Sequence, residues 1–284
     1  MCSTSPKQGG YAALALVLVL ITVLSALVAS YEARRGYVGV SRTDRLERDY
    51  LERAKNRITR FYAAHAAAMD TNAAAPWSDA QILISADVPL RWQVQVFIGG
   101  RQSVTVGGGS TTIDYRDIWL ALPGASNGGP AQAASLDSGT NTFLPGTSPA
   151  WTEISGTAIE NALYVRAQRQ LTRFGARLTA MYAADLATDG NHNIGVDDWQ
   201  PTGCGPYGGG VIACTNGQFV PISTLNVITA LGAQRIDTNN PWGEPLLASN
   251  TVDANTTAPP YTIILQSPLP WGGNLTDTIA EPIT

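Results

Sequence analysis

Charged side chains are scarce in this chain. Asp, Glu, Lys and Arg make up 14% of its 284 residues, against about a quarter in typical soluble domains. The formal net charge is −4, so the chain lacks the basic excess that general binding to nucleic acids requires. The charge is also uneven, because nine of the eighteen basic residues lie between Arg34 and Arg60. We therefore expect no general nucleic-acid binding.

Histidine is almost absent, which limits the acid–base chemistry open to the chain. Only His65 and His192 occur, and the spacing around His65 places it on an apolar helix stripe, where a packed or boundary residue is favoured over a base. The sequence has no nucleophile elbow, phosphate loop, zinc-protease helix or dinucleotide fingerprint. We therefore predict that the protein is not an enzyme.

Cysteine is rare as well. Cys2 lies near the N-terminus, and Cys204 and Cys214 flank a glycine-rich stretch. In an oxidising compartment such a close pair usually forms a disulfide, which would contribute about 2–3 kcal/mol for so short a loop. Metal ligation is the alternative, but no second cysteine pair or nearby histidine set completes a site. We predict a disulfide between Cys204 and Cys214.

The chain has one long hydrophobic run, at residues 11–29. No charged residue occurs between Lys7 and Glu32. At about 1.5 Å per residue, a helix of this length spans roughly 28 Å, enough to cross a bilayer core. Gly9 and Gly10 stand before the run, whereas the small-residue cleavage site of a secretory signal follows its apolar core.

This layout resembles the class III leader of type IV prepilins and of type II secretion pseudopilins. In that family a prepilin peptidase cuts after the glycine, here Gly10, and the new N-terminus, here Tyr11, is N-methylated. The resemblance implies a leader at residues 1–10 and a membrane and filament-core helix at residues 11–30. It also implies an inner-membrane subunit with a periplasmic head, and a pilus or periplasmic filament after assembly. The implied partners are other pilins or pseudopilins, the prepilin peptidase, the inner-membrane assembly platform and the membrane.

Ala15 departs from the family pattern. Most members carry a glutamate at the fifth mature position, which is thought to pair with the N-terminal amine of a neighbouring subunit; the residue here is Ala15. The difference argues against a repeating major subunit and is compatible with a minor subunit at the filament tip. The match in detail covers the first sixty residues and the turn at residues 241–243, which resembles a turn common in pilin and pseudopilin heads.

A plain single-pass signal anchor is the alternative for the N-terminal segment. Arg34 and Arg35 follow the hydrophobic run, whereas only Lys7 and the amino terminus precede it. This bias favours a cytoplasmic C-terminal part. The prepilin layout and the cysteine pair favour a head outside the cytoplasm.

The spacing of apolar residues predicts two long helices, one from Ser41 to about Asp70 and one over about residues 152–187. The first stripe is Leu46, Tyr50, Ala54, Ile58, Phe61, Tyr62 and His65. The second is Ile159, Leu163, Ala167, Leu171, Phe174, Leu178, Met181 and Tyr182.

Alternating and turn-rich segments predict the strands and loops. Residues 92–98 and 102–106 are expected to form a hairpin around a glycine pair, and residues 111–115 and 118–122 further strands. The segment 123–149 is rich in Gly, Ser, Ala, Asn and Pro and is expected to be a long loop. The turn at residues 241–243 should let Trp242 cover a core edge.

An internal echo links the two predicted helices. Residues 57–67 align with residues 177–187, with six of eleven positions identical, and strand-rich sequence follows each copy. We therefore predict an α+β fold in which a long N-terminal helix packs on antiparallel sheet. The echo indicates two pilin-like units, at residues 31–150 and 151–284.

One polar segment is a candidate calcium site. Asp189, Asn191, Asn193 and Asp197 place oxygen ligands at alternating positions, which suits Ca²⁺. The spacing matches the first three ligands of an EF-type loop and then fails, since Ile194 replaces the glycine. A polar loop whose side chains cap helices is the alternative.

Two functions follow from these patterns. The first is a structural filament component, a minor pilin or pseudopilin near the tip, with an exposed head for adhesion or partner contact. The alternative is a single-pass membrane-anchored periplasmic ectodomain with a binding or enzymatic role.

Overall fold

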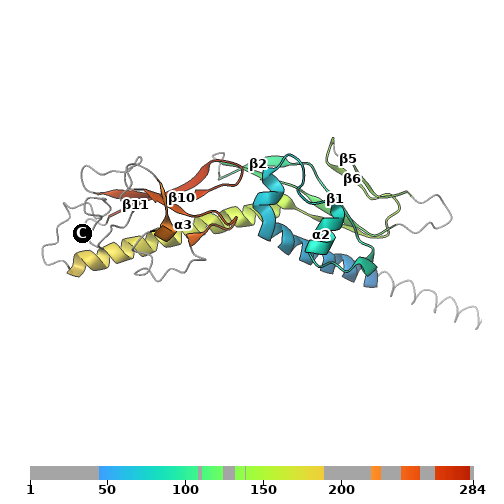
Figure 1. The fold of residues 1–284 in the computed structure, drawn as a ribbon, viewed down its shortest axis with the longest axis horizontal. Helices are drawn as coiled ribbons and strands as arrows, with labels where there is room; N and C mark the ends of the chain where they lie inside the picture. The colour runs from blue at the N-terminus through green and yellow to red at the C-terminus, as the bar shows by residue number, and fades with distance from the viewer. Residues whose placement is uncertain are drawn as a thin grey trace, which may run out of the picture.

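The computed structural model of the protein describes residues 45–107, 111–123, 132–137, 139–188, 219–224, 238–249 and 260–281. The molecule is elongated (Figure 1). Two long helices run along one side, and antiparallel sheets lie against them. The predicted α+β class with antiparallel sheets is thereby confirmed.

The first layer pairs the helix of residues 45–71 with a three-stranded sheet. Its strands are β1 (Gln95–Ile98), β4 (Ile118–Ala121) and β7 (Trp151–Ile154), in the order β1-β4-β7. All four residues of the central strand β4 are buried. Strand β7 belongs to this first sheet, so the chain passes to the second layer after residue 154. The sequence had placed the end of the first unit at residue 150.

The helix of residues 45–71 ends near Asp70, as its sequence predicted. Two residues of the expected stripe are nevertheless exposed, Leu46 and His65. Position 66 rather than 65 continues the four-residue steps from 58 and 62, so Ala66 takes the core position. The buried stripe is Leu51, Ala54, Ile58, Phe61, Tyr62, Ala66 and Met69.

Two short helical elements follow the first long helix and pack against this layer. Helix α2 (Asp79–Ser85) begins with a capping box, in which Ser78 and Gln81 each bind the other's backbone N–H. The 3-10 helix η1 (Leu90–Trp92) follows. Trp92 stacks on Tyr50 of the long helix, with ring centroids 5.1 Å apart.

The predicted hairpin between residues 92–98 and 102–106 is wrong. Strand β1 pairs with β4, whereas β2 (Gln102–Val106) pairs with β3 (Thr111–Tyr115) in a separate two-stranded sheet. The glycine pair does not close a turn between β1 and β2. The N–H of Gly99 donates to the carbonyl of Asp117, and that of Gly100 donates to Asn141 Oδ1. These contacts direct the chain from one sheet to the other.

The segment expected to be a long loop also contains a hairpin. Strands β5 (Ser135–Asp137) and β6 (Thr142–Leu144) pair antiparallel. Phe143 of β6 lies 5.3 Å from Phe97 and 6.0 Å from Trp119, centroid to centroid, which places the hairpin over the first sheet. Three-residue strands are too short for a periodicity signal.

The second layer pairs α3 (Gly156–Thr188) with a four-stranded sheet of order β11-β10-β9-β8. The predicted apolar stripe of this helix is confirmed, with Ile159 and Met181 partly buried and the other six residues buried. At Gly175 a Cβ would overlap the side chain of Ile279 on β11, so the glycine permits a close approach of helix and sheet. The strands are β8 (Val220–Pro221), β9 (Leu247–Ser249), β10 (Thr262–Pro268) and β11 (Asn274–Ala280).

Equivalent positions of the echo are buried in both helices. Ile58 and Leu178 are both fully buried, and Tyr62 and Tyr182 are both buried. In Figure 1 each helix lies beneath its own sheet.

Candidate functional site

The residues that the sequence singled out for processing, disulfide and calcium all lie outside the described part of the chain. This holds for Gly10 and Tyr11, for Cys204 and Cys214, and for Asp189, Asn191, Asn193 and Asp197. Among the described residues, no group of three or more His, Cys, Asp or Glu side chains could hold a metal ion. No helix within those described ranges is long and apolar enough to cross a membrane.

The structure brings together a set of polar side chains that the sequence had not combined. They lie where the first layer meets the second, and all five are buried. We call this set the polar joint; its members are Tyr62, Asp70, Arg116, Glu160 and Trp242.

Arg116 is the centre of the polar joint and has only 2% of its surface exposed. It lies in the two-residue connection between β3 and β4. Its Nε donates to the carbonyl of Met69 at 2.8 Å, and Nη2 donates to those of Asn72 at 2.5 Å and Ala73 at 3.0 Å. The last carbonyls of a helix lack partners within the helix. Arg116 supplies those partners here and adds positive charge at the negative end of the helix dipole.

The same guanidinium connects the helix end to the sheet. Nη1 of Arg116 donates to the carbonyl of Gly99 at 3.1 Å, just after β1. The backbone N–H of Arg116 donates to Tyr62 Oη at 2.8 Å. Tyr62 Oη in turn lies 3.0 and 2.9 Å from the two carboxylate oxygens of Asp70, to which it donates. The helix of residues 45–71 is therefore joined to the strands above it by charged and neutral hydrogen bonds that exclude water.

Glu160 and Trp242 belong to the second layer and extend the polar joint into it. Trp242 Nε1 donates to Glu160 Oε2 at 2.8 Å. Trp242 is held by a tight turn, in which Gly243 has φ of +93° and Asn240 Oδ1 accepts from the N–H groups of Trp242 and Glu244. The predicted turn at residues 241–243 and the buried position of Trp242 are confirmed.

The two carboxyl groups of the polar joint are buried, and burial raises the pKa of both. Burial and then the hydrogen bond with Asp70 raise the pKa of Glu160 to about 9, while the Trp242 N–H lowers it by less. Burial also raises the pKa of Asp70 to about 6, against the opposing effects of Glu160, Tyr62 and Arg116. As an anion, Glu160 would leave its buried Oε1 without a donor among the described residues. The raised pKa favours the carboxylic acid form of Glu160, which can donate a hydrogen bond to a carboxylate, and Asp70 is the more acidic group of the pair.

Gly156 allows the chain to enter α3 beside this network. Its N–H donates to Asp117 Oδ1 at 3.0 Å. A Cβ at this position would overlap the carbonyl oxygen of Arg116 and lie 2.6 Å from Tyr62 Oη. No larger residue fits without moving the backbone.

The polar joint is closed to substrates, because its members are at most 9% exposed. Its hydrogen bonds satisfy carbonyls at the end of the first helix and connect the two layers.

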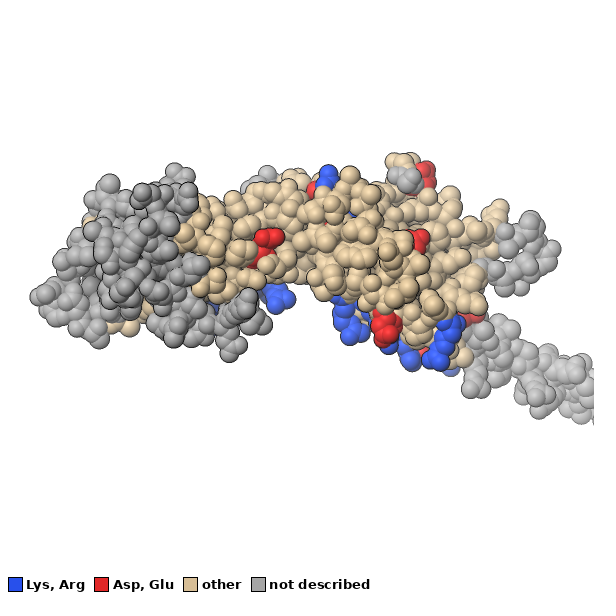
Figure 2. Space-filling view, viewed as in Figure 1, with Lys and Arg blue, Asp and Glu red and all other residues tan. Residues whose placement is uncertain are grey.

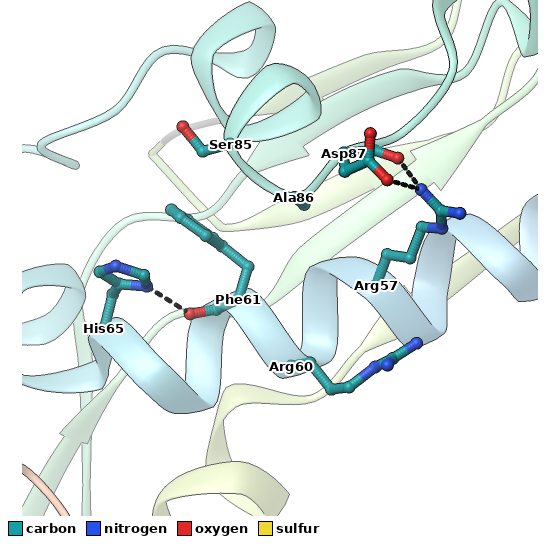
Figure 3. Close-up of a pocket in the computed structure, with 7 residues that line it drawn as sticks. All are labelled: Arg57, Arg60, Phe61, His65, Ser85, Ala86 and Asp87. Carbon is teal, nitrogen blue, oxygen red and sulfur yellow. Dashed lines mark hydrogen bonds and ion pairs between the residues drawn. The ribbon is translucent and has the colours of Figure 1, made fainter.

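An open groove of about 470 Å³ lies between the helix of residues 45–71 and the end of α2 (Figure 3). Arg57 crosses one end of it and bonds to the backbone carbonyl and the carboxylate of Asp87. His65 stacks on Phe61, with ring centroids 4.4 Å apart, and its Nδ1 donates to the Phe61 carbonyl at 2.9 Å. His65, the only histidine among the described residues, is thus an exposed residue beside an aromatic surface rather than a member of the core stripe.

Sequence reasoning missed three members of the polar joint. Asp70 was taken as part of a helix-ending turn, and Arg116 separates two predicted strands without any periodic signal. Glu160 could have been found, because it lies on the same helix face as Leu163 and Ala167, where an isolated charged residue is unusual.

Comparisons of the chain with protein-family models, with curated proteins and with solved structures gave no match.

Proposed function

We propose that this protein is a structural minor pilin or pseudopilin of a type IV pilus-like or type II secretion filament. It acts at or near the tip, with its head exposed for adhesion or partner contact. One observation carries the proposal. The amphipathic helix of residues 45–71 packs beneath an antiparallel sheet, and the apolar run of residues 11–29 precedes it in the sequence.

The contacts at the end of this helix support a mechanical role. A filament subunit held by its N-terminal helix must transmit force from that helix to its head. Arg116 bonds to the carbonyls of Met69, Asn72 and Ala73 and also to Gly99. Charge-assisted hydrogen bonds in a dry interior are among the stronger non-covalent contacts available for this purpose.

The second layer is proposed to be a further pilin-like unit, derived from the first by duplication. Its support is the echo of residues 57–67 in residues 177–187 and the burial of Ile58, Leu178, Tyr62 and Tyr182 at matching positions. The added unit would lengthen the head beyond that of a one-layer subunit.

The decisive experiment is to determine the N-terminus and intact mass of the protein extracted from membranes, with and without the prepilin peptidase. We expect a chain that begins at N-methylated Tyr11 only when the peptidase is present. Gly10→Val should block this change, whereas the matched control Gly9→Val should leave most of the cleavage intact. A chain that still begins at Met1 beside an active peptidase would overturn the proposal.

The experiment extends to assembly. A processed subunit should co-purify with filament or secretion-platform components, and this association should be lost in Gly10→Val. If the head keeps a binding or enzymatic activity after an unrelated anchor replaces residues 11–29, the anchored ectodomain becomes the better description.

A further inference from the structure

Helix α3 carries a row of arginines on one face. Its residues are separated by three, four and four positions, which keeps them aligned along the helix. Three of them are exposed and the last, Arg177, is half-buried. We call this set the arginine row; its members are Arg166, Arg169, Arg173 and Arg177.

The arginine row lies on a flank of the helix, beside its buried face. At 100° per residue, its centre is about 120° around the helix from the centre of the core positions Leu163, Leu171 and Leu178. In Figure 2 most of the visible Lys and Arg atoms lie along the edge of the molecule that the long helices form.

None of the four guanidinium groups forms an ion pair or side-chain hydrogen bond within the described part of the chain. No Asp or Glu occurs between residues 161 and 184, so the helix cannot supply one. Glu160, which precedes the row on α3, is buried in the polar joint.

The internal echo makes this lack of partners informative. The offset that aligns Arg57 with Arg177 also aligns Arg53 with Arg173 and Asp49 with Arg169. In the first helix these positions are neutralised, because Arg53 pairs with Asp49 at 2.7 Å and Arg57 with Asp87 at 2.5 Å. In α3 the same arginines remain, and an arginine replaces the acid. Among the described residues, α3 therefore has positive charges at these positions without the ion-pair partners of the first helix.

We infer that the arginine row is a docking surface for an acidic helix of a partner protein. This surface goes beyond the proposed filament role, since it concerns the outward face of the second layer. Guanidinium groups bind carboxylates with two parallel hydrogen bonds. Steps of three and four residues on α3 are about 4.5 and 6 Å along its axis, and a partner helix repeats carboxylates at the same intervals.

The surroundings of the row favour a helix over a longer polyanion. Ala162, Ala176 and Ala180 are exposed on the same side of α3 and leave room for a partner backbone. An extended polyanion or an anionic membrane would also meet the rest of the molecule, which is acidic because the whole chain, with the row included, has a formal net charge of −4. Outside the two long helices, the described charged residues are Asp79, Asp87, Asp114, Asp117, Asp137, Glu153, Glu244, Asp277 and Glu281 against Arg91, Arg101 and Arg116.

The test measures binding of a labelled helical peptide to the full chain in neutral detergent. The peptide has about 20 residues, mostly alanine, with glutamates at three- and four-residue steps along one face. Its partner peptide has the same composition, with the glutamates spread around the helix. We expect the striped peptide to bind at least about tenfold more tightly at low salt, and binding to weaken as salt screens the contact.

Two variants of the protein distinguish binding at the arginine row from a general effect of positive charge. Replacing all four members of the row by Gln should weaken binding of the striped peptide by about tenfold or more, given a modest contribution from each exposed pair. A control that replaces Arg45, Arg48, Arg53 and Arg60 by Gln removes the same charge from the first helix and should weaken it less than about threefold.

A charge exchange guards against a loss of folding. Arg173→Glu should weaken binding of the striped peptide. A striped peptide with one glutamate changed to lysine should bind this variant more tightly again. Equal losses in the two Gln variants, or equal binding of the two peptides, would overturn the inference. It would also be overturned if heparin, single-stranded DNA or anionic vesicles bound the row more tightly than the striped peptide.

Discussion

The indole nitrogen of Trp242 donates a hydrogen bond to Glu160 at 2.8 Å, across 82 residues of sequence. Glu160 is the fifth residue of α3, and Trp242 lies in the turn that precedes β9. Through Asp70 and Arg116 this contact continues to the end of the first long helix. The two layers are therefore connected by one buried polar network, and each of its members can be tested.

Glu160 should make stability depend on pH. Its pKa in the folded protein is raised to about 9 from an ordinary value of 4.5. The stability that its neutral form provides is fully present below about pH 4.5 and is lost as the pH rises through 9. We expect the free energy of unfolding to fall between pH 6.5 and 9, above the range in which Asp70 titrates, by up to about 1.4 kcal/mol per pH unit.

Glu160→Gln should remove that slope. A glutamine is neutral at every pH, and its amide can accept from Trp242 and donate to Asp70. Urea unfolding at several pH values measures the effect, with Glu153→Gln on the exposed side of β7 as the control. A wild-type slope that persists in Glu160→Gln would contradict the assignment of the proton to this carboxyl.

Trp242→Phe should keep the aromatic contact and lose the donor. The ring of Trp271 lies 5.5 Å away, edge to face, and would still meet a phenyl ring. Loss of the N–H leaves Glu160 Oε2 without its donor and should cost about 1–2 kcal/mol in the free energy of unfolding.

Because the Trp242 N–H lowers the pKa of Glu160, Trp242→Phe should also move the loss of stability to higher pH. Trp151→Phe is the matched control, since Trp151 is 50% exposed. An unchanged pH midpoint would show that the indole does not act on the carboxyl.

Arg116→Lys should destabilise the protein although it keeps the charge. A lysine ammonium cannot reach the separate carbonyls of Met69, Asn72, Ala73 and Gly99 as the guanidinium fork does. Several buried carbonyls would lose their donors, at a total cost of about 3 kcal/mol or more. Thermal unfolding provides the measurement, and Arg91→Lys, on the exposed face of η1, should change stability by less than about 0.5 kcal/mol. If the two changes had similar effects on stability, the hydrogen bonds of Arg116 would not be central to the network.

Gly156→Ala should destabilise, against the usual preference of helices for alanine. A Cβ here would overlap the Arg116 carbonyl, which belongs to the backbone and cannot rotate away. We expect a loss of about 1–3 kcal/mol, as for other overpacked positions. Gly139→Ala is the control, since a Cβ there meets only Asp137 Oδ1 at 3.3 Å. A stabilised Gly156→Ala would show that the backbone at the start of α3 has room for a Cβ beside the Arg116 carbonyl.

The buried face of each long helix could be predicted from the sequence. The stripe on α3 was predicted almost residue by residue, because a helix repeats its core contacts at three- and four-residue steps. The first helix was predicted with the right end and with two wrong members, Leu46 and His65. A repeat of 3.6 residues leaves neighbouring positions nearly equivalent, and only the packed sheet decides between them.

The pairing between strands was harder to predict from the sequence. Residues 118–122 and 111–115 were recognised as strands, but β1 was assigned to the wrong partner. Alternation tells which residues share a face and carries no information on which strand lies alongside. That choice depended on hydrogen bonds from Gly99 and Gly100 to segments beyond the next two strands.

The sequence alone determined where the long helices form and which of their faces are apolar, because these features depend on neighbours within a few residues. It also supplied the four arginines of the row at helical spacing. Only the tertiary structure decided that Asp70, Arg116, Glu160 and Trp242 meet, since Arg116 binds a carbonyl 44 residues away and Trp242 reaches across 82. Burial then changes their chemistry, because the free energy of a charge depends on the water it has lost.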